Sequence, residues 1–579
     1  MADPILVGVI GNRLASILNE QQTALVNTAF SSVVRESLDL ACGVFDSRGE
    51  MIGQSVGGTP GHINAMATGM RHFVAEFPPE RLVPGDVLLT NDPWQTAGQV
   101  NDFTVATPVF RGSRLVAWFA TCCHAPDIGG RILSAAATEV YEEGLQLPIM
   151  RLFRAGEVNE DLIAIVRKNV RTPDETVGDL YAQVAANEVG ARSLLALMEE
   201  FGLDSIDPIA DEIMERSENA LRRALAAMPD GTHTARLETD GFGEKTLLLQ
   251  AAVTIAGDEI HIDFDGSSPQ SRYGVNVVLN YTRAYSSFAV KAAIAPEVPH
   301  NAGSFRPVHV TAPAGSVLNC EHPAPVASRH LVGHFLPSLL FTALQPALPG
   351  KLLAQSADAL WMTVWRGHTD AGAEFMETVF QAGGSGARAI KDGLSTTGFP
   401  TGVRAAPTEV IETLTPLVQR RRELLPDSGG AGRWRGGLGQ ATDVVCRSGA
   451  EWTVNANVDR TRFPASGVDG GGPGRPGSIT LGSGAEVPRK QLVRLAPGNE
   501  LHLRMPGGGG YGDPRTRSPE QVLNDVVDGY VSIESARESY GVAVRYLGAP
   551  DALVRTPEMY ELDPAETERL RPRTPPTGA

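Results

Sequence analysis

Hydrophobic residues recur with two different spacings along this chain, and each spacing predicts its own kind of element. Residues 38–55 alternate between apolar and polar positions and turn at residues 47–49, as a β-hairpin does. Residues 103–124 predict a second hairpin, with Arg-Gly-Ser as its turn. Near the start, apolar residues instead recur every three or four positions, which predicts an amphipathic helix with an inner face of Val7, Ile10, Leu14, Ile17, Leu18, Gln21 and Leu25.

The spacing changes several times along the chain, and these changes suggest how it is organised. A helical pattern lies between parts with strand patterns, and glycine runs punctuate the chain beyond residue 382. We predict a large, multi-layer subunit of the mixed α/β (α+β) class. Its expected parts are a β-rich N-terminal α/β part with the candidate metal site (1–158), a helical insertion (159–228), a central α/β part (229–381), a glycine-rich β part (382–514), a C-terminal helical segment (515–562) and a disordered tail (563–579).

Composition narrows the class of protein further. The 579 residues include 62 glycines and 40 prolines, which favours turns and strands over long helical bundles. The formal net charge of −17 argues against a nucleic-acid-binding protein. No apolar run approaches the ~20 residues of a transmembrane helix, and the N-terminus lacks a signal-peptide pattern. Five cysteines without a Cys-x-x-Cys pair make no disulfide framework, so we expect a cytoplasmic protein with reduced thiols.

The segment LVAWFATCCHAPDIGG, residues 115–130, carries the densest set of reactive side chains. On a strand, Cys122 and His124 point to one side and Cys123 points to the other. The two thiols lack the further ligands that a structural zinc site needs, so we expect them to fill apolar space in a buried strand. His124 ends the strand and Asp127 follows in a loop, which leaves these two as candidates for chemistry.

A second segment, NDPWQTAGQVND at residues 91–102, supplies a carboxylate for the same place. Asp102 begins the strand that pairs with the His124 strand in the predicted hairpin, so the two residues are expected on one rim. A carboxylate beside an imidazole suits a divalent metal ion or a general acid–base pair. Asp39, at the start of another predicted strand, is a third candidate.

Several ordered motifs lie between roughly residues 12 and 541. They include VVRESLDLACGVFD, GHINAM, HAPDIGG, EVYEEGLQLP, PHNAGSFRPVHVTAPAGSVLN, GGSGARAIKDG, LLPDSGGAGRWRGGLG and MPGGGGYGDP. Together they make the chain resemble the hydantoinase B/oxoprolinase family, which includes N-methylhydantoinase B subunits and subunits of acetone and acetophenone carboxylases.

The resemblance implies an ATP-dependent heteromeric enzyme. A hydantoinase A-type partner subunit would bind ATP and phosphorylate a carbonyl or enolate oxygen, and the B-type subunit would complete the reaction. The chain itself has no GxxxxGK[ST] loop.

The resemblance also implies a set of metal ligands. In several relatives the NDP segment continues to Thr-His-x-x-Asp, whose His and Asp bind a divalent metal together with the histidine of the H-x-x-D-I-G-G segment. Asp102 and His124 match this pattern, whereas Gln99 stands where the first histidine would be. Asp39 and Asp127 would complete a set that suits Mn²⁺ or Mg²⁺ better than Zn²⁺. The alternative is that the site has degenerated and holds no ion.

Other positions are secondary candidates. His62 matches a family histidine and is expected near the site as a catalytic residue, unless it is an ordinary core histidine. The glycine runs lack a following helix with Lys-Ser/Thr and are expected to be close-packed loops. The remaining candidates are three carboxylates that offer a general base or are ordinary surface groups, Glu139, Glu142 and Glu143, and two residues that head a predicted helix and would hold an anionic group, Arg329 and His330.

We therefore expect a subunit that opens a cyclic amide or imide of the hydantoin or 5-oxoproline type. Asp102 and His124 would orient a water molecule, metal-bound or free, at the activated carbonyl carbon. One alternative is a subunit of an acetone- or acetophenone-type carboxylase, which acts on a ketone. The other is a non-catalytic scaffold subunit that only supports assembly.

Overall fold

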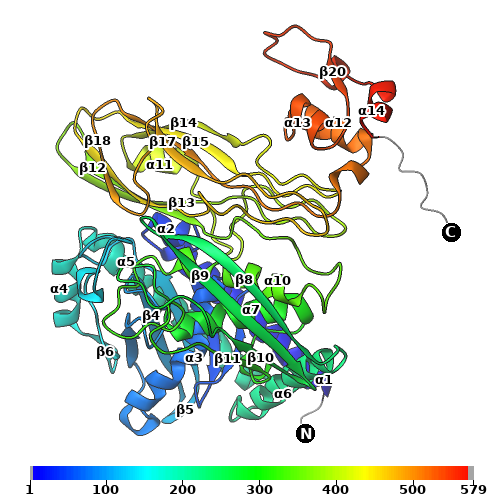
Figure 1. Ribbon diagram of the computed structural model, residues 1–579. Coiled ribbons are helices and arrows are strands. Elements are labelled where there is room, and N and C mark those ends of the chain that lie inside the picture. Colours follow the sequence, from blue (N-terminus) through cyan, green and yellow to red (C-terminus); the bar gives the residue numbers. More distant parts are fainter. Residues whose placement is uncertain (1–3, 572–579) are drawn as a thin grey trace.

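A seven-stranded antiparallel sheet forms the centre of the N-terminal half of the chain in the computed structural model, which describes residues 4–571 (Figure 1). Its strand order is β2-β1-β5-β4-β3-β6-β7. Both predicted hairpins lie in this sheet as neighbouring strands. The strands are β1 (Leu40–Asp46), β2 (Met51–Gln54), β3 (Val87–Thr90), β4 (Asp102–Arg111), β5 (Arg114–His124), β6 (Met150–Arg154) and β7 (Glu157–Val158).

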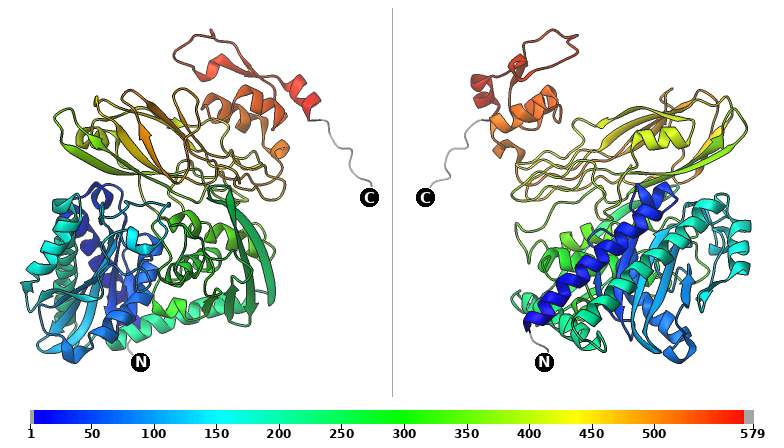
Figure 2. Two further views of the ribbon diagram at one scale, coloured as in Figure 1. Left: turned by 60° about the vertical axis from the view of Figure 1, so that its left-hand side comes forward. Right: turned by 180° about the vertical axis from the view of Figure 1, so that it is seen from behind.

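Helices cover both faces of this sheet. On one face, α1 packs along α5, as the right-hand view of Figure 2 shows, and their apolar sides share a core with α6. The predicted inner face of α1 is confirmed, since all seven of its residues are buried. On the other face α3 packs against β1, β4 and β5. These helices and their short neighbours are α1 (Pro4–Thr28), α2 (Ser32–Arg35), α3 (Pro60–Glu76), α4 (Glu160–Asn169), α5 (Pro173–Glu200) and α6 (Asp207–Ala226).

A second sheet, in the order β11-β10-β9-β8, lies beside the first and carries helices α7 and α10. Its two long strands form the hairpin that rises toward the C-terminal half in Figure 1. The elements of this part are β8 (Gly231–Phe242), β9 (Lys245–Ala256), β10 (Glu259–Asp263), β11 (Val308–Thr311), α7 (Leu279–Ile294), α8 (Ala302–Phe305), α9 (His330–Gly333) and α10 (Leu336–Leu344).

Two four-stranded sheets face each other in the next part and enclose a separate core. The stacked rings of Trp365 and Trp452, with centroids 5.6 Å apart, lie in it. One sheet has the order β13-β12-β16-β18 and the other β14-β15-β19-β17. Their elements are β12 (Trp361–His368), β13 (Glu374–Gln381), α11 (Thr408–Leu414), β14 (Leu417–Leu424), β15 (Gln440–Cys446), β16 (Trp452–Asn457), β17 (Ser478–Leu481), β18 (Leu492–Leu495) and β19 (Glu500–Arg504).

The glycine runs form close-packed loops beside these sheets, as the sequence predicted. Gly437 N donates to Ser385 O at 2.8 Å, and Gly508 N donates to Gly437 O at 3.0 Å, so three distant runs pack backbone to backbone. A Cβ atom added to Gly508 would lie 2.0 Å from Ser385 O. Glycine is required here because any side chain would push the packed loops apart.

The last part of the chain forms a small unit around its own core. Here the sequence prediction was wrong in one respect. The tail expected to be disordered from residue 563 begins with helix α14, and only its residues 572–579 lie outside the described part. The elements are α12 (Pro519–Val527), α13 (Ile533–Glu538), β20 (Val544–Tyr546), β21 (Tyr560–Leu562) and α14 (Pro564–Leu570).

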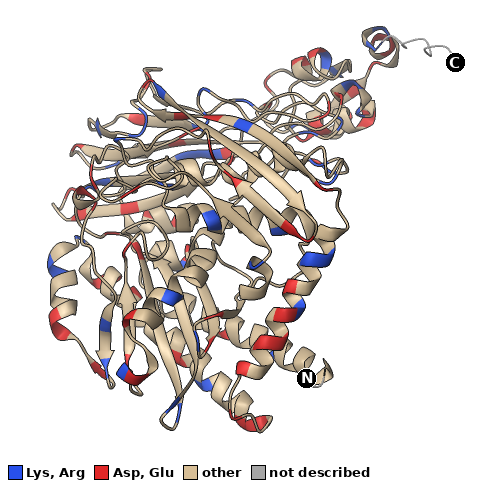
Figure 3. Ribbon diagram, turned by 60° about the horizontal axis from the view of Figure 1, so that its bottom comes forward, with Lys and Arg blue, Asp and Glu red and all other residues tan. Residues whose placement is uncertain are grey.

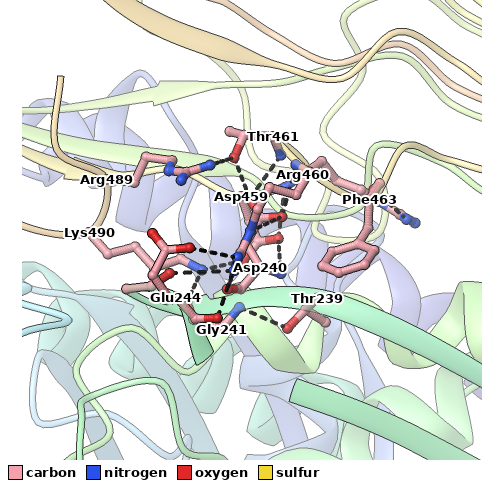
Figure 4. Close-up of polar contacts among 12 residues, drawn as sticks. Thr239, Asp240, Gly241, Glu244, Asp459, Arg460, Thr461, Phe463, Arg489 and Lys490 are labelled. Atoms are coloured by element: carbon pink, nitrogen blue, oxygen red, sulfur yellow. Dashed lines mark hydrogen bonds and ion pairs between the residues drawn. The ribbon is translucent and has the colours of Figure 1, made fainter. Parts of the chain in front are cut away.

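A buried polar junction fastens the tip of the β8–β9 hairpin to the two facing sheets (Figure 4). Asp240, near the end of β8, accepts hydrogen bonds from Thr461 N at 2.8 Å and Arg462 N at 3.0 Å. Lys490 Nζ lies 2.5 Å from Asp459 Oδ2 and also donates to Gly241 O. The junction therefore connects the sheet of β8–β11 to the part of the chain that contains the two facing sheets.

Helices account for 31% and strands for 25% of the residues, which confirms the predicted mixed α/β class. Basic residues are interspersed among acidic ones over the ribbon (Figure 3). Within residues 4–571, no helix has the length and apolar character needed to cross a membrane.

Candidate active site

The β4–β5 hairpin places Asp102 directly opposite His124 in its register. Nδ1 of His124 lies 2.9 Å from Oδ1 of Asp102, and both side chains are fully buried. The alternation of β5 also follows the prediction, because Cys122 packs in the apolar cluster under α3 and Cys123 packs in a cluster with residues of α5. Both thiols are buried, and burial raises their pKa well above the ordinary value.

Two further predicted residues join this pair. His62, in the first turn of α3, places Nε2 3.3 Å from Asp102 Oδ2 and Nδ1 3.5 Å from Asp39 Oδ1. The second distance is an ion-pair contact without hydrogen-bond geometry, since His62 Nδ1 has no hydrogen-bond partner among the described residues. Thr59, at the N-cap position of α3, donates from its hydroxyl to Asp39 Oδ1 at 3.1 Å. The backbone carbonyl of Asp39 accepts from His124 N at 3.1 Å.

A buried arginine completes the cluster. Arg329 donates through Nη2 to Asp102 Oδ2, through Nη1 to Gln99 Oε1 and through Nε to Ala97 O at 2.8 Å. Its guanidinium lies over the ring of Tyr281, 4.3 Å from the centroid. The anionic group that Arg329 holds here is thus the carboxylate of Asp102 from its own chain.

The segment before Arg329 is fixed by a buried glutamate. Glu143 Oε1 accepts from Val326 N at 2.5 Å and from Ala327 N at 2.8 Å. Burial raises the pKa of Glu143 to about 8, so the carboxyl holds its proton at neutral pH. Gln99 joins the same segment by donating from Nε2 to Ala327 O. Glu143 therefore positions Arg329, a role that the sequence pattern did not suggest.

The charged side chains of the cluster shift one another's pKa toward the charged form. Burial by itself would raise the pKa of Asp102, but the charges of Arg329 and His62 and the hydrogen bond from His124 hold it well below its usual range. Burial would lower the pKa of His62, yet the carboxylates of Asp102 and Asp39 raise it above the ordinary value. Burial by itself would lower the pKa of Arg329, but the carboxylate of Asp102 raises it above the ordinary value.

The structure places the other sequence candidates differently. Asp127 accepts from Gly129 N at 3.1 Å and forms an ion pair with Arg171 at 2.8 Å, so its carboxylate is engaged in fixing its own loop. Glu142 pairs with Arg131 at 3.0 Å. His330 is buried beside Arg329, and burial together with that charge lowers its pKa to about 3. A neutral His330 at the start of the four-residue helix α9 carries no charge with which to hold an anion.

Three members of the ligand set that the resemblance implied contact arginine side chains in this structure. Gln99 Oε1 and Asp102 Oδ2 both accept from the guanidinium of Arg329, and Asp127 is bound to Arg171. Among the described residues, His, Cys, Asp or Glu ligand atoms gather within 4.8 Å in two other places, and both groups could hold an ion by geometry. They are Glu259, His261 and His309, and Asp443, Glu500 and His502.

Comparison with known proteins shows which family this chain belongs to. Residues 3–514 match the model of the hydantoinase B/oxoprolinase family. The chain belongs to this family. The putative B-type subunit of a D-/L-hydantoinase from Pseudomonas sp. (strain NS671) is 30% identical over 569 residues, which are 94% of this chain and 95% of the relative.

Two solved structures have the same fold as this chain. A chain of the ATP-dependent caprolactamase from Pseudomonas jessenii superimposes with a TM-score of 0.89 at 28% identity, over 99% of this chain and 100% of that chain. A nucleotide-free acetone carboxylase superimposes with a TM-score of 0.83 at 20% identity, over 98% and 82%. At that lower identity, the likeness to acetone carboxylase shows the fold alone.

Proposed function

We propose that this chain is the B-type subunit of an ATP-dependent, heteromeric amidohydrolase that opens a cyclic amide or imide of the hydantoin or 5-oxoproline type. A hydantoinase A-type subunit would bind ATP and phosphorylate the amide carbonyl oxygen. Membership of the hydantoinase B/oxoprolinase family and the likeness to a hydantoinase subunit and an ATP-dependent caprolactamase support this reaction class.

The observation that carries the proposal is the orientation of His124. A carboxylate accepts but does not donate, so Nδ1 of His124 carries the proton that it shares with Asp102 at 2.9 Å. Nε2 is then the basic nitrogen, and it is buried without a hydrogen-bond partner among the described residues. Asp102 fixes the tautomer and stabilises the protonated imidazole, which is the arrangement a general base requires.

In the proposed reaction, His124 Nε2 takes a proton from a water molecule as that water attacks the phosphorylated amide carbon. His124 returns this proton to the ring nitrogen, and the hydroxyl of the tetrahedral adduct supplies a second one. The C–N bond then breaks, the nitrogen leaves with both protons, and the hydroxyl oxygen becomes the carbonyl oxygen of an acyl phosphate. A second water converts the acyl phosphate into a carboxylate and inorganic phosphate. Because His124 is fully buried, substrate binding has to open a path to Nε2 in the assembled complex.

The test combines the chain with a hydantoinase A-type partner and ATP. We would supply hydantoins, 5-oxoproline, caprolactam and a ketone with bicarbonate in turn, and measure the organic product and phosphate together. Ring opening that needs both chains, consumes ATP and is lost in His124→Ala is expected. Product that forms only from a ketone with bicarbonate would identify a carboxylase subunit instead. A partner ATPase that needs this chain but is indifferent to His124→Ala would identify a scaffold.

A further inference from the structure

We infer that Arg329 supplies the fixed positive charge at the Asp102–His124 pair and takes the place of a divalent metal ion there. The chemical role of this charge rests on the proposed function, whereas the prediction that the site binds no metal does not. The contacts of Arg329 do not fit the ligand set that the resemblance implied.

The guanidinium of Arg329 fills the inner side of the turn at residues 97–102. Its three nitrogens each donate to a different acceptor of that turn, namely Ala97 O, Gln99 Oε1 and Asp102 Oδ2. The ring of Tyr281 covers one face of the guanidinium, and the Arg329 side chain is only 3% exposed. A planar fork of donors matched to three acceptors is a fixed cation, because arginine does not lose its proton in proteins.

Gln99 is complementary to this arginine. Its amide nitrogen donates to Ala327 O, which turns its oxygen toward Arg329. Both ends of the amide are therefore used, and neither is free to bind an ion. An amide oxygen is a good acceptor for guanidinium and a poorer ligand than imidazole for Zn²⁺ or Mn²⁺. Gln99, which stands where the family pattern has a histidine, is thus matched by Arg329, whose guanidinium donates to its side-chain oxygen.

The remaining candidate ligands do not converge on a point that would suit an ion. Among residues 4–571, the two groups of three ligand atoms that lie within 4.8 Å of one another contain neither Asp102 nor His124. A divalent ion at Asp102 would also have to stand beside the buried guanidinium, where repulsion between like charges is strong and screening by solvent is weak. Arg329 therefore excludes the ion whose charge it replaces.

The first experiment measures the metal content of the full chain. The two other groups of ligand atoms could bind ions by themselves, so the background protein carries His261→Ala, His309→Ala and His502→Ala. After dialysis against a chelator and then against Zn²⁺ or Mn²⁺ followed by buffer, elemental analysis should find well below one ion per chain. Near one ion per chain that disappears in Asp102→Asn would overturn the inference.

The second experiment restores the missing histidine. In the same background, Gln99→His alone should gain no metal because Arg329 is still present, whereas Gln99→His with Arg329→Ala should bind about one Zn²⁺ or Mn²⁺ per chain. Gln99→His with Arg329→Lys keeps the charge and should stay free of metal. Metal binding by Gln99→His alone, or a folded double variant with alanine that binds none, would contradict the assignment. Circular dichroism and melting curves identify folded variants, and if the alanine variant unfolds, Gln99→His alone decides.

A third measurement uses the complex with the partner. A chelator selective for transition metals, with excess Mg²⁺ retained for ATP, should leave ring opening unchanged; loss of turnover that added Zn²⁺ or Mn²⁺ restores would count against the inference. The outcomes remain distinguishable from failure of the proposed function. A metal-free chain without hydrolase activity would end the proposed reaction and leave the role of Arg329 as the internal cation standing.

Discussion

Arg329 and Asp102 form a buried ion pair although 227 residues separate them along the chain. The pair connects the start of β4 to the segment before α9, and through Asp102 it reaches both His62 and His124. The carboxylate of Asp102 thus contacts the side chains of Arg329, His62 and His124, which come from separate parts of the chain.

Loss of the His124 imidazole should remove the general base. In His124→Ala we expect ring opening in the assembled complex to fall by about 10²- to 10⁴-fold, the usual contribution of such a group. Product formation measured at saturating ATP and substrate checks this. His368→Ala, a change to an exposed histidine at the end of β12, is the matched control and should keep full activity. Folded His124→Ala protein with unchanged turnover would remove His124 from the mechanism.

Asp102→Asn should cost stability as well as activity. The variant leaves the buried guanidinium of Arg329 without its counter-ion, and breaking such a pair on one side typically costs about 3–5 kcal/mol. Urea unfolding of the isolated chain measures the change in the free energy of unfolding. The double variant Asp102→Asn with Arg329→Met removes both charges and should recover part of the loss. Strict additivity of the two single changes would speak against a coupled pair.

Glu143→Gln should change how stability depends on pH. The folded-state pKa of Glu143 is raised to about 8, so between its ordinary pKa of about 4.5 and pH 8 the unfolded chain loses this proton while the folded chain keeps it. This group therefore makes the wild type lose stability as pH rises through that window, by on the order of 5 kcal/mol in total.

Glutamine at residue 143 keeps the oxygen that accepts from Val326 and Ala327 but cannot ionise. The stability of Glu143→Gln relative to the wild type should therefore increase from pH 5 to pH 8. Urea unfolding at pH 5, 6.5 and 8 gives this difference directly. If the difference in unfolding free energy between the two proteins is the same at all three pH values, Glu143 does not titrate in this window.

Gly508→Ala should destabilise the packed glycine loops. Its Cβ would lie 2.0 Å from Ser385 O, which is backbone that cannot move aside without disturbing the neighbouring runs. We expect a loss of about 3 kcal/mol or more, because overpacking of this kind forces backbone shifts. Gly8→Ala in α1, where nothing lies within 4 Å of the added atom, is the control and should be neutral or stabilising by up to about 1 kcal/mol. Similar melting temperatures for the two variants would contradict the prediction.

Much of the local structure was predictable because it depends on periodicity. The seven inner positions of α1 follow from helical spacing alone, and the register that pairs Asp102 with His124 follows from the lengths of two alternating strands and the turn between them. Residue type also indicated that Cys122 and Cys123 would be buried fillers. The start of α14 was missed because a proline-rich and highly charged segment resembles a disordered tail.

The residues alone were enough to predict many of the strands and helices, the family motifs, and the meeting of an imidazole and a carboxylate at one hairpin rim. The folded structure was needed to show that Arg329 pairs with Asp102, that Glu143 fixes the segment before Arg329, and that Asp127 pairs with Arg171. The difference lies in the distance over which each kind of signal acts. Hydrophobic spacing reports on neighbours within a turn or a strand, whereas a buried charge takes its partner from whatever element the packing brings beside it.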